Sequence, residues 1–220
     1  MSANTKRGLA SNMEHLQCYW EKRAATAVND SERVDQNPRT QRMRFAAFAQ
    51  VHDLRGKSVL DVGCGLGDLW PYLHQQFDDC EYIGFDISTE MIRRCRERFP
   101  GVRFESGNFL EWDPGRKFDY VVAIGIHNNL RLEKGWELLE EVTRRQFELC
   151  RVNTHVSLLT DRYPRFGPEI QAWRAEDVLA MALRITPWVT LRHDYLPNDF
   201  SVTLYRESLI DARPDLLAGC

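Results

Sequence analysis

The chain has 220 residues, of which 29 are basic and 32 acidic, giving a formal net charge of -3 at pH 7. This length suits one well-buried α/β domain better than two. The near-balance of charge gives no electrostatic reason to expect a nucleic acid or an anionic membrane as a partner.

Targeting signals and cysteine usage indicate the compartment. The first seven residues are followed by no apolar run, so we expect no secretory signal, and no stretch of about 18 apolar residues predicts a membrane span. The six cysteines include no C-x-x-C pair. Scattered cysteines in a globular chain are typical of reduced thiols, so we expect a cytoplasmic protein.

Two helices are expected ahead of the first strand. Residues 13–27 and 40–52 each carry apolar side chains at helical spacing, and the polar stretch 29–38 separates them. The first ten residues are polar and are expected to be loose. We therefore expect an N-terminal helical cap at 1–54 and an α/β domain at 55–220, together forming one compact domain.

The first strand is expected to end in a tight glycine turn. Residues 59–62 read Val-Leu-Asp-Val, a sequence typical of the end of a buried parallel strand. Gly63, Gly65 and Gly67 follow. Glycines let the backbone turn sharply and approach a ligand closely because they have no Cβ.

A second expected strand ends on an acid, Asp86, which lies nineteen residues (86 − 67) past Gly67. An acid in this place accepts hydrogen bonds from ribose hydroxyls, so the turn and the acid predict a nucleoside-bearing cofactor. The dinucleotide fingerprint G-x-G-x-x-G cradles a pyrophosphate, whereas this turn reads G-x-G-x-G between Asp61 and Asp68. Acids on both sides repel a pyrophosphate but suit a ligand that carries an ammonium group and no phosphate.

Strands and helices alternate along the rest of the chain, and two strands close it. Alternation of this kind predicts a parallel sheet covered on both faces, and the turn 196–199 predicts an antiparallel hairpin at the end. The expected strands are 58–62, 81–86, 102–105, 118–124, 154–160, 188–195 and 200–205, and the expected helices are 67–76, 88–98, 136–150 and about 174–184.

These motifs, in this order, resemble the class I S-adenosylmethionine (SAM)-dependent methyltransferases. The resemblance is close over residues 55 to 130 and holds only in outline elsewhere. It implies a Rossmann-like class I methyltransferase fold: α/β, with a mostly parallel seven-stranded sheet, a C-terminal antiparallel hairpin and N-terminal capping helices. It also implies SAM as cofactor and S-adenosylhomocysteine (SAH) as product. The motifs are Val-Leu-Asp-Val-Gly-Cys-Gly-Leu-Gly at 59–67, Ile-Gly-Phe-Asp-Ile-Ser at 83–88 with Met91-Ile92, Ser-Gly-Asn-Phe at 106–109, and Phe-Asp-Tyr-Val-Val at 118–122.

The resemblance implies cofactor contacts at the ends of the first two strands. Gly63 and Gly65 are expected to pack against the methionine and ribose parts of SAM, and Asp86 to accept the ribose hydroxyls. Ile87 is expected on one face of the adenine. Asp61 is expected to hold a water or the α-amino end through a neighbour, or alternatively to stabilise the turn.

Three further positions are expected beside the cofactor. Asn108 stands where the family often has Asp at the exocyclic amine of the adenine, and its amide oxygen accepts that bond without the charge. Phe109 is expected either to stack against the ring or to belong to the core. Ile124 ends the fourth expected strand, next to the cofactor.

The loop 123–129 faces the methyl group in this fold. His127 is its strongly titratable side chain, and an unperturbed pKa near 6.5 suits a general base, the alternative being a histidine that shapes the pocket. Asn128 is expected to orient a polar substrate or to cap the next helix. The chain lacks the Asn-Pro-Pro-Tyr-like motif of adenine and glutamine methylators. It also lacks the acidic set with which catechol-type members hold magnesium, so no metal is expected.

Aromatic residues are expected to cover the acceptor. Tyr19 and Trp20 on the first helix are candidates for a cover, or they dock that helix on the sheet, and His15 lies one turn away. Tyr163, in a stretch with Pro and Gly after the fifth strand, is a candidate for the acceptor pocket.

The sequence therefore predicts a methyltransferase that acts on oxygen or nitrogen of a small soluble metabolite, such as a natural-product intermediate. We expect a monomer or homodimer, with neither nucleic acid nor membrane as partner. One alternative is a SAM-binding regulatory protein without turnover, and another is an RNA or protein methyltransferase. The glycine spacing disfavours a nicotinamide-dependent oxidoreductase.

Overall fold

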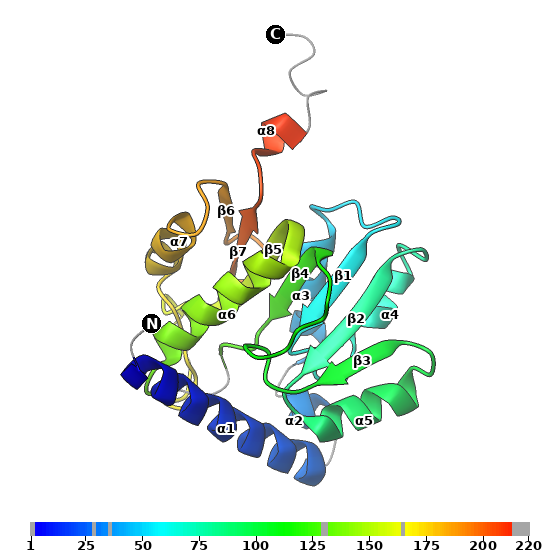
Figure 1. The fold of residues 1–220 in the computed structure, drawn as a ribbon, viewed down its shortest axis with the longest axis vertical. Helices are drawn as coiled ribbons and strands as arrows, with labels where there is room; N and C mark the ends of the chain where they lie inside the picture. The colour runs from blue at the N-terminus through cyan, green and yellow to red at the C-terminus, as the bar shows by residue number, and fades with distance from the viewer. Residues whose placement is uncertain (1–2, 28–29, 35–36, 129–131, 164–165, 213–220) are drawn as a thin grey trace.

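A seven-stranded mixed sheet runs through the middle of the molecule (Figure 1). The computed structural model describes residues 3–27, 30–34, 37–128, 132–163 and 166–212. The strand order is β3-β2-β1-β4-β5-β7-β6, in which neighbouring strands from β3 to β5 are parallel and β7 is antiparallel to both β5 and β6. The strands are β1 (Ser58–Val62), β2 (Glu81–Asp86), β3 (Arg103–Ser106), β4 (Phe118–Ile124), β5 (Cys150–Leu159), β6 (Val189–Arg192) and β7 (Asp199–Tyr205).

Helices cover both faces of the sheet and one of its edges. They are α1 (Ala3–Thr26), α2 (Asp30–Val34), α3 (Pro38–Ala49), α4 (Leu69–His74), α5 (Thr89–Arg98), α6 (Gly135–Leu149), α7 (Ala175–Leu183) and α8 (Leu209–Ala212). Figure 1 shows α1 lying across the molecule from the start of α6 to the start of α5. The expected class I architecture is confirmed.

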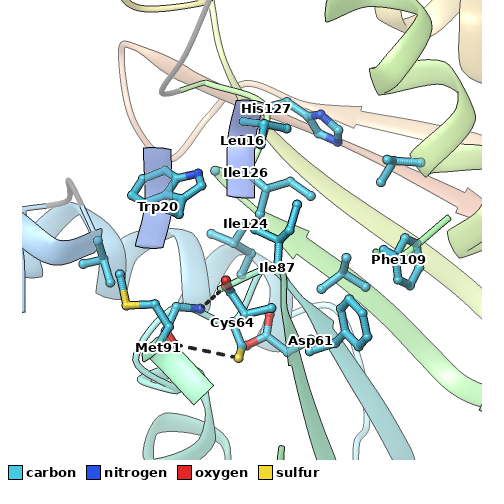
Figure 2. Close-up of a pocket in the computed structure, with 18 of the residues that line it drawn as sticks. Leu16, Trp20, Asp61, Cys64, Ile87, Met91, Phe109, Ile124, Ile126 and His127 are labelled. Carbon is cyan, nitrogen blue, oxygen red and sulfur yellow. Dashed lines mark hydrogen bonds between the residues drawn. The ribbon is translucent and has the colours of Figure 1, made fainter. Parts of the chain in front are cut away.

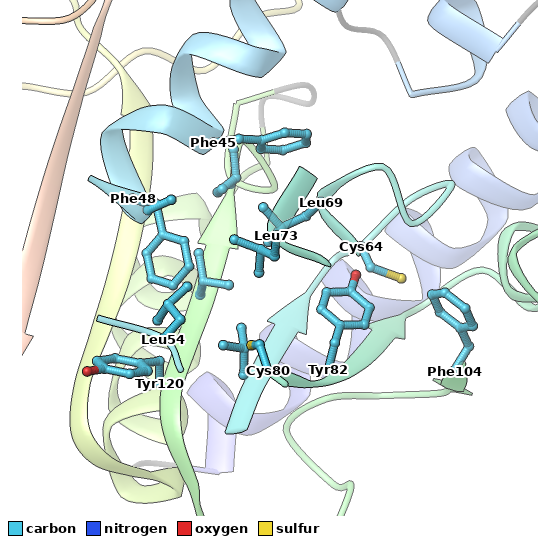
Figure 3. Close-up of a cluster of buried hydrophobic side chains, with 14 of the residues drawn as sticks. Phe45, Phe48, Leu54, Cys64, Leu69, Leu73, Cys80, Tyr82, Phe104 and Tyr120 are labelled. Carbon is cyan, nitrogen blue, oxygen red and sulfur yellow. The ribbon is translucent and has the colours of Figure 1, made fainter. Parts of the chain in front are cut away.

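Burial explains why the central strands are nearly continuous apolar runs. Every residue of β1 and of β7 is buried, as both faces of a parallel sheet require when helices cover them. On one face, Phe45 and Phe48 of α3 pack with Leu73 of α4 and with Tyr82 and Tyr120 of the sheet (Figure 3). On the other face, a separate cluster joins the sheet to α6 and α1.

The N-terminal helix is longer than the sequence pattern predicts. The first ten residues were expected to be loose, but α1 begins at Ala3. Leu9 is 4% exposed and packs with Met13, four residues on, in the cluster that also holds Leu138 and Val142 of α6. Two apolar residues one turn apart extend the buried face, and tertiary packing supplies the stability that a polar helix end lacks.

Two other boundaries also differ from expectation. The polar stretch 29–38 contains the short helix α2, and β5 begins at Cys150, ahead of its expected start at 154. Cys150 is fully buried and pairs with Phe118, and the register between β4 and β5 shifts before Tyr120. The irregular pairing accommodates the first residues of β5.

The helix α3 is fixed at its start and in its middle. Asn37 caps it, its Oδ1 accepting from the N–H groups of Arg39 at 2.9 Å and Thr40 at 3.4 Å, and Pro38 occupies the first turn. Arg44 donates from Nε and Nη2 to the two carboxylate oxygens of Asp199, at 2.6 and 3.0 Å. Both side chains are buried, so this ion pair ties α3 to the first residue of β7.

Within the described ranges, no helix is both long enough and apolar enough to cross a membrane.

Candidate active site

The carboxyl ends of β1, β2 and β4 open into one cavity of about 1060 Å3, counted with its open mouth. Figure 2 shows Asp61 and Cys64 at one side of the cavity and Leu16 and Trp20 of α1 at the other. The sequence-predicted residues that line it are Trp20, Asp61, Gly63, Gly65, Asp86, Ile87, Phe109, Ile124 and His127.

The glycine turn is held tightly against the end of β2. Gly63 and Cys64 both donate their N–H groups to the carbonyl of Phe85, at 2.7 and 3.0 Å. Gly63 has φ 74° and Gly65 has φ 56°, a region that side chains disfavour. A Cβ at Gly63 would also collide with Cγ2 of Ile126, so the turn requires glycine there.

Asp86 is anchored at the rim of this turn. Its Oδ2 accepts the N–H of Gly65 and its Oδ1 accepts the N–H of Ser88, both at 2.9 Å. The residue is 7% exposed. Burial raises the pKa of Asp86 to about 6, although the bonds from Ser88 and Gly65 lower it. The carboxylate is thus oriented by backbone groups rather than neutralised by a cation.

Asp61 is a second buried acid in the same cavity. Its Oδ2 accepts the phenol hydroxyl of Tyr82 at 2.7 Å. Burial raises the pKa of Asp61 to about 7, the bond from Tyr82 lowers it, and the charge of Asp86 raises it again. Two acids in a low-dielectric pocket concentrate negative potential, which favours a cationic ligand.

Apolar side chains form much of the remaining wall. Ile87, Ile124 and Ile126 line the cavity, and the ring of Phe109 meets that of Phe85 edge to face at 5.6 Å between centroids. Phe109 is therefore both a lining residue and part of the core. Asn108 is not among the lining residues, and its Oδ1 accepts the N–H of Leu110 at 3.1 Å.

His127 is 8% exposed at the end of the β4 loop. Its carbonyl accepts Nε1–H of Trp173 at 3.1 Å, and its own Nε2 is buried without a hydrogen-bond partner in the described structure. Burial lowers the pKa of His127 to about 3, so the ring is neutral at pH 7.

Comparisons with known proteins agree with this geometry. A family model described as a methyltransferase domain matches residues 59–146, the part of the chain that carries the glycine turn, Asp86 and His127. The expected resemblance to the class I SAM-dependent methyltransferases is therefore confirmed over residues 59–146.

Curated methyltransferases match about a third of this chain. The trans-aconitate 2-methyltransferase of Afipia carboxidovorans is 33% identical over 79 residues, which are 36% of this chain and 31% of that protein. The fatty-acid O-methyltransferase of Mycolicibacterium smegmatis is 34% identical over 83 residues, 36% of this chain and 30% of that protein. The chain thus spans about a third of the length of the curated relatives it matches.

A solved structure extends the likeness to most of the chain. The magnesium protoporphyrin IX methyltransferase of Synechocystis PCC 6803, crystallised with bound SAH, superposes with a TM-score of 0.62. The match covers 88% of this chain and 99% of that one at 15% sequence identity. At this identity the comparison concerns the fold.

The structure places some of the residues expected to cover the acceptor at the cavity and others outside its lining. Trp20 lines the cavity, whereas Tyr19 does not, its ring meeting that of Trp20 edge to face at 5.1 Å. His15 is exposed and lies away from the lining. Met13 and Leu16, which the sequence analysis did not select, line the cavity instead. Their spacing from Trp20, seven and four residues, places all three on one helix face.

Two other candidate site residues, Asn128 and Tyr163, do not line the cavity. Asn128 is buried, its Oδ1 accepting the N–H of Leu159 at 3.0 Å and its carbonyl that of Gln171 at 2.9 Å. Tyr163 is half-buried, contacts the ring of Phe166 at 5.2 Å and is not among the lining residues. In the described part of the chain, no group of three His, Cys, Asp or Glu side chains is arranged to hold a metal ion.

Proposed function

We propose that the protein transfers the methyl group of SAM to oxygen or nitrogen of a small molecule. The observation that carries this proposal is the Asp86 carboxylate, held by Gly65 and Ser88 beside a turn of positive-φ glycines. An oriented acid at the end of the second strand fits ribose hydroxyls. The described residues that line the cavity beside Asp61 and Asp86 include no Lys or Arg that could neutralise a phosphate. This fits a cofactor that carries cationic groups.

The chain's own groups divide the work of holding the cofactor. Asp86 takes the ribose, Gly63 and Gly65 allow close approach of the backbone, and Ile87 and Phe109 supply apolar surface for the adenine. Asp61 contributes negative charge toward the amino end. When bound, the sulfonium of SAM supplies an electrophilic methyl group, so the protein mainly has to align the acceptor and exclude water.

His127 is the proposed general base. Because the ring is neutral, it has a lone pair with which to accept a proton. A base with so low a pKa removes only a proton that becomes more acidic as the acceptor bonds to the methyl group. General base catalysis of this kind raises the rate by about a hundredfold or more. If His127 instead only shapes the pocket, alignment alone supplies the rate.

The acceptor is proposed to be small, because α1 roofs the cavity with Met13, Leu16 and Trp20. The acceptors of the curated relatives do not transfer to this chain, since the match to them is partial. No Lys or Arg occurs among the described lining residues, which argues against a polycarboxylate acceptor.

The free state of Cys18, Cys64, Cys80, Cys95 and Cys150 supports a reducing, cytoplasmic setting.

Thermal unfolding with SAH, SAM or NAD at equal saturating concentrations tests the cofactor. A ligand at a hundred times its dissociation constant adds about 2.7 kcal/mol, and each kcal/mol raises the midpoint by about 2–4 °C at this size. We expect a rise with SAH and SAM and none with NAD. A rise with NAD alone would overturn the proposal. Binding of SAH without methyl transfer to any member of a broad acceptor panel would favour the non-catalytic regulatory alternative.

A further inference from the structure

We propose that Glu21 is a latch that holds the α1 roof shut over the cavity and sets the rate at which cofactor enters and leaves. The identity of the ligand in this inference rests on the proposed function, whereas the latch itself rests on contacts between α1 and α5.

The carboxylate of Glu21 receives four hydrogen bonds from the start of α5. Oε1 accepts both the N–H and the Oγ1–H of Thr89 at 2.6 Å. Oε2 accepts the Oγ–H of Ser88 at 3.1 Å and the N–H of Glu90 at 3.2 Å. One side chain of α1 therefore accepts hydrogen bonds from three consecutive residues at the start of α5.

Helix physics favours a negative charge at this place. The first N–H groups of α5 have no partner within the helix, and the helix dipole is positive at this end. Ser88 caps α5 by accepting the N–H of Met91 at 3.2 Å, which leaves its hydroxyl hydrogen for Glu21. Burial acts to raise the pKa of Glu21, but the bonds from Thr89, Glu90 and Ser88 outweigh it and lower that pKa. Glu21 is thus ionised at neutral pH.

The latch connects the roof, through Ser88, to Asp86, the acid proposed to bind the ribose. Ser88 donates its hydroxyl to Glu21 and its N–H to Asp86, so the segment 86–88 is held from both sides. Trp20, which precedes Glu21, and Leu16, one turn earlier, line the cavity. Movement of Glu21 away from α5 would therefore uncover the side of the cavity where Asp86 lies.

The two ends of the roof are held by different forces. Toward α6, Leu9 and Met13 pack in the apolar core. Toward α5, the contacts of Glu21 are polar and involve N–H and O–H groups that water can replace. Ala24 and Trp20 add a small apolar contact with Met91. The end at α5 is therefore the end that can open without exposing the main core.

Glu21→Gln tests the latch, because the amide keeps the length of the side chain but turns an N–H2 group toward donors. Glu14→Gln is the matched control, since Glu14 is exposed on the same helix. Stopped-flow measurement of SAH binding, followed by tryptophan fluorescence, should show both association and dissociation accelerated about tenfold in Glu21→Gln. Since a latch stabilises the closed roof with and without ligand, the dissociation constant should change by less than about twofold.

Hydrogen exchange of the free protein provides a readout that needs no ligand. Amides at the α5 end of α1, residues 16–26, should exchange faster in Glu21→Gln than in the Glu14→Gln control. Thr89→Val, which removes the Oγ1 donor but keeps the backbone N–H, should show the same effects more weakly, and it serves if Glu21→Gln does not fold.

Unchanged exchange and unchanged SAH kinetics in Glu21→Gln and Thr89→Val would overturn the latch. A loss of affinity at an unaltered association rate would also overturn it, because that result describes a binding contact rather than a gate. If the unaltered chain does not bind SAH, the proposed function fails, and hydrogen exchange still decides whether Glu21 holds the roof.

Discussion

At the residue scale, the unusual feature of the cavity is a pair of buried acids without a cation. Burial raises the pKa of Asp61 to about 7 and that of Asp86 to about 6. Keeping both charged in a low-dielectric cavity is unfavourable unless a ligand contributes positive charge or hydrogen-bond donors. Asp61 already uses one oxygen on Tyr82, and Asp86 uses both on backbone N–H groups.

Asp61→Asn should stabilise the free protein above pH 7 by on the order of 1–3 kcal/mol. The folded-state pKa of Asp61 is raised, so its contribution to stability is full below the unfolded value near 3.8 and is lost as pH rises through about 7. Urea unfolding should therefore show a larger difference between variant and parent at pH 8 than at pH 5. An equal effect at both values would contradict the assignment of a charged, buried Asp61.

Asp86→Ala should weaken SAH binding by about 1–3 kcal/mol, because it deletes a charge-assisted contact. Isothermal titration calorimetry measures the change, and Asp78→Ala, an exposed acid elsewhere on the chain, should leave affinity unaltered. Unchanged binding in Asp86→Ala would refute the ribose role.

His127→Ala should lower turnover about a hundredfold while leaving SAH affinity nearly intact, because the base acts only as the methyl group moves. His15→Ala is the control, since His15 is exposed and away from the cavity. If His127→Ala keeps full turnover, alignment of the acceptor accounts for the rate. Loss of turnover in His15→Ala would restore that residue to the acceptor site.

At the element scale, α3 is positioned by a contact that the linear pattern does not reveal. Arg44 and Asp199 are separated by 155 residues, yet they form a buried, two-bonded ion pair between α3 and the start of β7. The same helix contributes Gln41 and Phe45 to the cavity wall. The pair therefore links the C-terminal hairpin to the geometry of the site.

Arg44→Ala should lower the free energy of unfolding by about 3–5 kcal/mol, because it leaves the Asp199 carboxylate buried without its partner. Chemical denaturation measures this, with Arg42→Ala on the exposed part of α3 as control. The double variant Arg44→Leu with Asp199→Leu should recover part of the loss, since no uncompensated charge remains. Equal stability of Arg44→Ala and Arg42→Ala would show that the ion pair contributes little.

At the scale of the whole molecule, net charge and local charge have different consequences. The chain carries only -3 overall, and much of its surface charge is arranged in exposed ion pairs such as Arg93 with Glu90 and Arg145 with Glu148. Exposed pairs of this kind contribute little to stability. The cavity acids, by contrast, act where solvent does not screen them.

The rise in unfolding temperature that SAM causes should therefore be larger at pH 8 than at pH 5.5. Over this range Asp61 and Asp86, with pKa values of about 7 and 6, lose protons and attract a cationic ligand. Differential scanning fluorimetry at the two values, each against ligand-free protein, measures the effect. A shift that is independent of pH would contradict the electrostatic role of these acids.

The order of the strands, the glycine turn and the acid at the end of β2 are local patterns, and sequence alone was enough to predict them. Strand periodicity, glycines that need positive φ and an acid at a strand end each depend on a few neighbouring residues. The same reasoning identified Asp61, Asp86 and His127, which all line the cavity.

Sequence by itself thus determined the fold class and the strand ends that line the cavity. The tertiary structure decided that α1 starts at Ala3 and that Met13 and Leu16, rather than Tyr19 and His15, line the cavity. It also decided two long-range contacts, that of Glu21 with α5 and the Arg44–Asp199 ion pair. The physical reason is range. Periodicity and turn chemistry act between residues a few positions apart, whereas these contacts join segments 68 and 155 residues apart, which only packing brings together.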